Sequence, residues 1–158
     1  MERIKLNGFA RITEIETGKV IAEAHNMIVK TGRQFIMKKI ANPNDTTNID
    51  KIYFSNGTNM TTEDDNICLD ESGEKYRIND EYILYAANIN PSNTAPSDAM
   101  YLHYSIQINA SDVSELTGQT LSEIGLILSN NTLFSRLIHE PITLSASRSY
   151  KVDYYIYF

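Results

Sequence analysis

An alternation of apolar and polar residues with a period of two constrains this chain more than any other feature. It runs through 102–109 and returns over 150–158. Successive side chains of a strand point to opposite faces, so this alternation predicts strands with one buried face and one outward face. Apolar residues also dominate 121–128 and 132–138, and the intervening Ser129-Asn130-Asn131 predicts a hairpin turn, because asparagine tolerates left-handed backbone geometry.

The first third of the chain shows the same pattern with less regularity. Residues 2–30 predict a hairpin whose turn is Glu16-Thr17-Gly18-Lys19, where the glycine adopts positive φ easily. A further strand is expected over 49–55, and Asn56-Gly57 ends it. In the later hairpin we expect Glu140-Pro141 to break the second arm, since proline has no amide hydrogen to donate to a sheet.

One segment changes to helical spacing. Thr31-Gly32-Arg33-Gln34 matches a capping box, in which the threonine and glutamine side chains satisfy free amides of the first helical turn. Three apolar residues then fall on one face, namely Phe35, Ile36 and Ile40. Asn42-Pro43-Asn44 ends the pattern, because proline cannot continue a helix. We therefore predict one short helix at about 31–41.

The middle of the chain carries the negative charge. Residues 61–81 hold eight acidic and two basic residues, a net charge of −6 that equals the net charge of all 158 residues. The segment 90–97 is a loop by composition, whereas 82–86 is a candidate strand. We interpret 58–100 as a long, acidic, loop-rich insertion at the surface.

Together these features predict a mainly β protein. We expect a single structural domain over 1–158, built as an antiparallel β-sandwich with one short helix and a long acidic loop region. The chain has ten tyrosines, five phenylalanines and no tryptophan, and many of these aromatic residues lie in the alternating runs. Such residues fit the half-buried surface of a strand.

Composition and charge argue against several kinds of partner. The acidic balance and the lack of a clustered lysine and arginine face argue against nucleic acid. No run approaches about 18 apolar residues and no signal-peptide pattern follows Met1, so we expect no membrane segment. Cys68 is the single cysteine and cannot form an intrachain disulfide, which fits folding in a reducing cytoplasm.

No arrangement of residues points to chemistry. The three histidines lack metal-ligand spacing and are expected at the surface or half-buried: His25, His103 and His139. Acidic neighbours of Cys68 disfavour a thiolate nucleophile. Four residues offer the oxygen ligands that calcium prefers but lack the EF-hand spacing: Asp64, Asp65, Asn66 and Asp70. We expect no enzyme, no cofactor and no metal.

Four short motifs follow one another in an order that carries information. They are Thr31-Gly32-Arg33-Gln34-Phe35-Ile36, then the strand Ile49 to Gly57, then Glu123-Ile124-Gly125-Leu126, then Leu133-Phe134-Ser135-Arg136 with Pro141-Ile142-Thr143 behind it. This order resembles a loose group of phage virion proteins and phage-tail-like bacteriocin components, including the attachment ends of tail-collar fibre proteins. The resemblance covers 31–57 and 102–158. In it, Gly125 is expected to permit close backbone approach or a bulge, and Glu123 to satisfy a buried donor.

The resemblance implies a structural component of a bacteriophage particle or phage-tail-like machine, in the tail, baseplate or fibre attachment region. It would assemble in the bacterial host cytoplasm with other virion proteins, as a homo-oligomer or in many copies. One alternative is a head decoration, head-fibre or neck protein. Another is a module that binds carbohydrate or a receptor on the host surface, through four tyrosines expected to be exposed: Tyr53, Tyr101, Tyr155 and Tyr157.

Two segments are candidates for adding a strand to the sheet of a neighbouring protein. They are the N-terminal arm Glu2–Ile15 and the C-terminal strand 150–158. For the C-terminal strand, pairing within its own sheet is the alternative.

Overall fold

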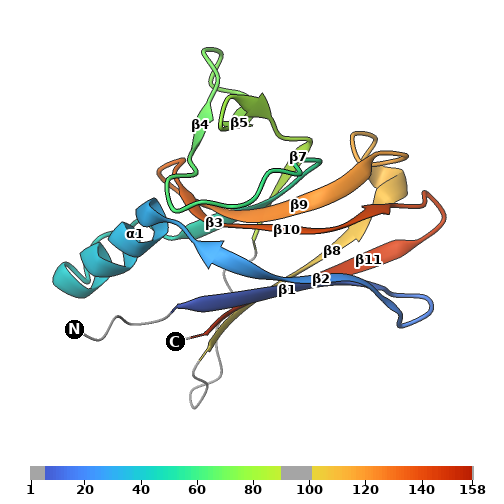
Figure 1. Cartoon of the computed structure of the whole chain (residues 1–158), viewed down its shortest axis with the longest axis horizontal. Coiled ribbons are helices and arrows are strands. Elements are labelled where there is room, and N and C mark those ends of the chain that lie inside the picture. Colours follow the sequence, from blue (N-terminus) through green and yellow to red (C-terminus); the bar gives the residue numbers. More distant parts are fainter. Residues whose placement is uncertain (1–5, 90–100, 158) are drawn as a thin grey trace.

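The computed structural model describes residues 6–89 and 101–157, and within these ranges the protein is mainly β with one α-helix (Figure 1). Eight strands form the main sheet and three short strands form a smaller one. The helix α1 (Lys30–Ala41) joins the second strand to the third. The strands are β1 (Asn7–Glu14), β2 (Val20–Ile28), β3 (Ile49–Ser55), β4 (Ile67–Leu69), β5 (Tyr76–Ile78), β6 (Glu81–Tyr82), β7 (Tyr85–Asn88), β8 (Tyr101–Asn109), β9 (Thr120–Leu128), β10 (Leu133–Thr143) and β11 (Ser149–Tyr157), with a 3-10 turn η1 (Ala110–Asp112) after β8.

The main sheet is antiparallel and has the strand order β7-β3-β9-β10-β2-β1-β11-β8. β2 and β10 pair at only two positions, Ile28 with Ser135 and Met27 with Arg136. At this narrow junction the sheet curls into a half-barrel whose two halves face each other across the core (Figure 1). A mainly β, antiparallel fold with a short helix is therefore confirmed. The eight strands form one curled sheet, however, and not the two separate layers expected of a β-sandwich.

The core lies between the two halves of the curled sheet and follows the alternation seen in the sequence. The inward residues of β11 are buried as predicted: Tyr150, Val152, Tyr154 and Ile156. Phe158, the last residue of the predicted strand, lies outside the described residues. The facing half contributes Phe54, Leu126 and Phe134, each no more than 1% exposed. Alternation in strands 100 residues apart thus builds a single apolar layer.

Both predicted hairpins are confirmed. β1 and β2 meet at a turn in which Gly18 has a φ of 69°, and β9 and β10 meet at a turn in which Asn131 has a φ of 64°. The predicted break at Glu140-Pro141 is wrong, because β10 continues through it to Thr143. The pairing with β9 shifts between Ile138 and Ile142, and this bulge accommodates the proline.

The helix is confirmed, but its predicted N-terminal cap is wrong. α1 begins at Lys30 with Val29 as N-cap, and no side chain caps its first amides. Thr31 lies inside the first turn and donates its hydroxyl to the carbonyl of Leu133 in β10. Phe35 packs edge-on against Phe134, while Ile40 is 76% exposed although it was expected on the buried face. The helix is held by β10 and not by its own cap.

The described part of the insertion, residues 58–89, contains four short strands. β4, β5 and β6 form a small sheet, and β7 extends the main sheet beside β3. The candidate strand 82–86 is divided between β6 and β7. The small sheet packs on the outer side of β3, β9 and β10 through a second apolar cluster: Val29, Tyr53, Ile67, Ile78, Ile127 and Leu133. The loop expected over 90–97 lies outside the described residues.

Replacing Gly32 with alanine tests how the helix docks. A Cβ at this position would lie 2.2 Å from the backbone carbonyl oxygen of Phe134, and backbone cannot move aside as a flexible side chain can. We expect Gly32→Ala to lower the free energy of unfolding by about 1–3 kcal/mol, measured by urea titration. The matched control Ile40→Ala, on the exposed side of the same helix, should change it by no more than about 0.5 kcal/mol. Equal effects of the two substitutions would contradict this docking.

Candidate assembly surface

A buried ion network joins the main sheet to the segment that leads into the small sheet. Arg136 of β10 places Nε 2.7 Å from Oε2 of Glu123 in β9 and Nη1 2.9 Å from Oδ2 of Asp65, which precedes β4. The three side chains are at most 5% exposed. One arginine therefore holds the small sheet and the main sheet together through two carboxylates.

Neutral donors complete this network. The Tyr53 hydroxyl donates to Glu123 at 2.8 Å, and Asp65 accepts hydrogen bonds from the backbone and hydroxyl of Thr62 and from the amide of Asn79. Burial alone would raise the pKa of Asp65, but these hydrogen bonds and Arg136 outweigh it and lower that pKa. Burial and the adjacent Glu123 raise the pKa of Tyr53 well above its ordinary value, so it stays a neutral donor.

Two glycines make room for the network. A Cβ on Gly57 would lie 2.0 Å from Oε1 of Glu123, and a Cβ on Gly125 would lie 2.1 Å from the ring of Tyr53. Gly125 also lies close to the carbonyl of Ser135, where a Cβ would be 2.6 Å away. Both residues are required by close approach, and neither has positive φ. The roles expected for Glu123 and Gly125 are confirmed.

Sequence reasoning missed that Asp65 belongs to the network. The sequence predicts an acidic surface residue at this position, yet Asp65 is buried and paired with Arg136. Its carboxylate oxygens are occupied by protein donors, so it does not join the neighbouring acids as a calcium ligand. A possible signal was Ile67 two residues later, because that apolar side chain anchors the small sheet in the second cluster.

Three of the four tyrosines expected to be exposed lie together. Tyr101 of β8 has its ring centroid 5.8 Å from those of Tyr155 and Tyr157 in β11, and the latter two are 6.1 Å apart. They lie on the outer face of the half-sheet β8-β11-β1-β2, because Tyr155 and Tyr157 alternate with the buried residues of β11. This half-sheet lies away from the half that the small sheet covers (Figure 1). Tyr53 does not join them, because the small sheet buries it completely. We call Tyr101, Tyr155 and Tyr157 the tyrosine cluster.

Polar residues border the tyrosine cluster. The His103 ring stacks on Tyr155 at 4.4 Å and 5°, and its Nε2 lies 2.7 Å from Oδ1 of Asp153. Lys151 approaches the same carboxylate at 3.6 Å. Phe9 of β1 lies directly opposite Tyr155 in the register. This face thus combines aromatic rings, which are enriched at interaction surfaces, with a charged border.

The other two histidines lie apart. His25 is exposed beside Phe9, with ring centroids 5.5 Å apart. His139 is only 6% exposed, which corrects its expected surface or half-buried position. Its Nδ1 donates to the Glu140 carbonyl at 2.7 Å, while its Nε2 is buried and has no hydrogen-bond partner among the described residues. Cys68 is an exposed free thiol on β4.

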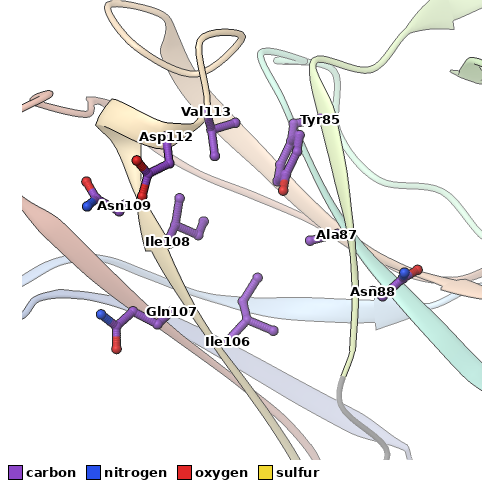
Figure 2. Close-up of a pocket in the computed structure, with 9 residues that line it drawn as sticks. All are labelled: Tyr85, Ala87, Asn88, Ile106, Gln107, Ile108, Asn109, Asp112 and Val113. Atoms are coloured by element: carbon purple, nitrogen blue, oxygen red, sulfur yellow. The ribbon is translucent and has the colours of Figure 1, made fainter.

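A cleft of about 390 Å³ lies between the two outermost strands of the main sheet. Figure 2 shows Ile106, Ile108 and Val113 on one side pointing toward Tyr85 and Ala87 on the other. Asn88, Gln107 and Asn109 point away from this apolar space (Figure 2). The half-barrel is therefore open along the line where β7 and β8 face each other.

The described residues hold no group of three or more histidine, cysteine, aspartate or glutamate side chains arranged to bind a metal ion. Within the same ranges, no helix has the length and apolar character needed to cross a membrane. Comparison of the chain with protein-family models, curated proteins and solved structures found no match.

Removing the central arginine tests the ion network. We expect Arg136→Met to lower the free energy of unfolding by about 3–5 kcal/mol, because Glu123 and Asp65 would stay buried without a counter-charge. The control Arg11→Met breaks an exposed ion pair with Glu23 and should change stability by about 0–1 kcal/mol. Urea titration measures both, and a loss for Arg136→Met no larger than that for Arg11→Met would contradict this role.

The burial of His139 predicts that the free energy of unfolding depends on pH. Burial lowers the pKa of His139, so the folded state favours the neutral ring. Its contribution is fully present above the pKa of the unfolded residue, about 6.5, and is lost as the pH falls from there through the lower folded pKa. Free energies of unfolding at pH 7.5 and pH 5 should therefore differ less in His139→Leu than in the wild type. An unchanged difference in His139→Leu would contradict this role of His139.

Proposed function

We propose that this protein is a structural component of a bacteriophage particle or phage-tail-like machine, in the tail, baseplate or fibre attachment region. The observation that carries the proposal is that residues of the four motifs lie close together in the folded protein. Gly57, Glu123 and Arg136 come from three of them and touch within one buried network. Gly32, from the remaining motif, lies against the backbone of Phe134. The motifs that resemble virion proteins thus form one structural unit.

A protein of this kind acts through its surfaces. The tyrosine cluster and its charged border offer a face for other virion proteins, and the ion network holds the small sheet in place behind the opposite half of the sheet. The net charge of −6 favours protein partners over nucleic acid. We place the protein in the virion, assembled from the host cytoplasm.

The pairing of β1 and β11 does not support the role expected for them as strands donated to a neighbouring sheet. β1 is paired on both sides, by β2 and β11, and β11 is paired on both sides, by β1 and β8. β1 is paired on both sides over 8–13 and β11 over 150–157, so along these residues neither strand presents an edge to a neighbour. Residues 1–5 of the expected N-terminal arm lie outside the described residues.

Carbohydrate or receptor binding at the host surface is the second candidate function. It is favoured by the gathering of Tyr101, Tyr155 and Tyr157 on one face. Sugar rings stack on open aromatic faces, and His103 already covers one face of Tyr155. Tyr157, 42% exposed, offers more open ring surface. The geometry therefore supports assembly contacts better than a row of sugar subsites.

Mass spectrometry of purified particles tests the proposed function. Particles from lysed cells of the bacterium that carries the gene are separated on a density gradient, and peptides of this chain are quantified in each fraction. We expect the chain to follow the particle fractions in a fixed ratio to the other virion proteins. A chain that stays in the soluble fractions, away from particles, would overturn the proposal.

Immunogold labelling of the same particles then separates the alternatives. Label at the tail, baseplate or fibre attachment site supports the stated position. Label on the head or neck replaces it with the decoration or neck alternative. Label at the distal tips of fibres favours the carbohydrate- or receptor-binding function.

A further inference from the structure

The outward side of α1 is both basic and apolar. The helix contains four basic residues and no acidic one. Phe35 packs toward the protein, against Phe134 of β10. Away from this contact, four exposed residues follow one another at helical spacing and so share one face: Lys30, Arg33, Met37 and Ile40. We call these four residues the helix stripe.

The described chain does not cover the helix stripe. Met37 is 66% exposed and Ile40 is 76% exposed. Neither Lys30 nor Arg33 forms an ion pair within residues 6–89 and 101–157. Figure 1 shows α1 reaching out beyond the strands at one end of the molecule. Large apolar side chains exposed beside basic ones mark an interaction surface.

An acidic patch lies at one end of the small sheet. It consists of Glu63-Asp64, before β4, and Asp80-Glu81, between β5 and β6. The backbone amide of Asn66 donates to Oδ1 of Asn79, and the amide of Asn79 donates to the carbonyl of Asn66, each at 3.2 Å. These bonds hold both acidic pairs at the same end of the sheet. All four acidic side chains are exposed, and none is ion-paired with a described residue.

The helix stripe and the acidic patch are also matched in apolar character. Within the described ranges, the four most exposed large apolar side chains are Met60 (87%), Ile40 (76%), Met37 (66%) and Tyr82 (54%). Two of them belong to the helix stripe, and the other two, Met60 and Tyr82, flank the acidic patch in sequence. Contact between the two surfaces would therefore pair opposite charges and also remove apolar area from water.

We propose that two copies of this chain bind each other reciprocally, with the helix stripe of each copy against the acidic patch of the other. The carbonyl of Glu63 accepts the backbone amide of Lys30 at 2.9 Å, so the two surfaces are neighbours on one copy. A two-fold axis that passes between neighbouring surfaces of opposite charge brings each surface against its complement. Every charge contact then occurs twice.

A second copy fits the helix stripe better than a phosphate surface does. Nucleic acid or an anionic membrane would attract Lys30 and Arg33 but would be repelled by the acidic patch beside them. A second copy turns that same neighbour into a second favourable contact. The inference stands apart from the proposed function, because this dimer can form whatever the protein assembles with.

Light scattering on a sizing column, over a range of protein concentrations, gives the first test. We expect a species of twice the 17.9 kDa mass of one chain, in reversible equilibrium with the monomer. Salt screens exposed charges, so the dissociation constant should rise about tenfold between about 0.1 M and about 1 M salt. A monomer at every concentration, or a dimer insensitive to salt, overturns the inference. Either result leaves the proposed function open, because particle fractionation does not depend on self-association.

Charge reversal tests which surfaces meet. One variant carries Lys30→Glu and Arg33→Glu, and the other carries Asp64→Lys and Glu81→Lys. Each variant alone places like charges opposite each other, so we expect its dissociation constant to rise at least about tenfold. An equal mixture of the two variants restores opposite charges at both contacts and should dimerise as the wild type does. Circular dichroism checks that both variants fold. Failure of the mixture to dimerise would contradict the pairing.

A matched control separates the acidic patch from general negative charge. Glu71 and Glu74 are exposed on the turn that joins β4 to β5, at the opposite end of the small sheet. Glu71→Lys with Glu74→Lys changes the net charge as much as the patch variant does, and we expect it to leave the dissociation constant nearly unchanged. Equal weakening by the two variants would show an effect of net charge and overturn the assignment to the patch.

Vesicles of phosphatidylglycerol test the other occupant of the helix stripe. We expect the wild-type protein to stay in solution when such vesicles are sedimented. Binding by the wild type that is lost in the variant with Lys30→Glu and Arg33→Glu would assign the stripe to an anionic membrane surface and overturn the proposed dimer.

Discussion

Arg136 is the residue on which the arrangement of the two sheets depends. Its guanidinium is buried between Glu123 and Asp65, one from the main sheet and one from the segment that leads into the small sheet. A buried charge is tolerated only when its partners are in place, so this pair of contacts requires the small sheet to sit over β3 and β9. That position in turn buries Tyr53, which would otherwise be an exposed aromatic residue on the outer face.

The coverage by the small sheet makes the two halves of the curled sheet different. One half is covered on both faces, by the core on one side and by β4, β5 and β6 on the other. The other half keeps an open outer face with Tyr101, Tyr155 and Tyr157, and it ends in β8. The tyrosine cluster therefore lies on one side of the protein, where we propose that it makes assembly contacts.

Much of the strand pattern could be predicted from the sequence, and the predictions that were wrong share one physical cause. Period-two alternation located β8 and β11, and asparagine and glycine located both hairpin turns. The predicted capping box was wrong because the Thr31 hydroxyl donates a hydrogen bond to the carbonyl of Leu133. Leu133 belongs to a strand more than 100 residues away in sequence. The predicted surface positions of Asp65 and Tyr53 were wrong for the same reason. The burial of these residues depends on contacts with Arg136 and with the small sheet. Local patterns carry no information about such distant partners.

The sequence by itself determined that the chain is mainly β, where the strands alternate and where the hairpins turn, because these properties depend on neighbouring residues alone. The resemblance to virion proteins also implied structural roles for Glu123 and Gly125. Only the tertiary structure decided that eight strands form one curled sheet, which tyrosines are exposed, and that β8 is left at an edge. Those outcomes depend on which strands pair and on which face the small sheet covers, and both are set by contacts between residues far apart in the chain.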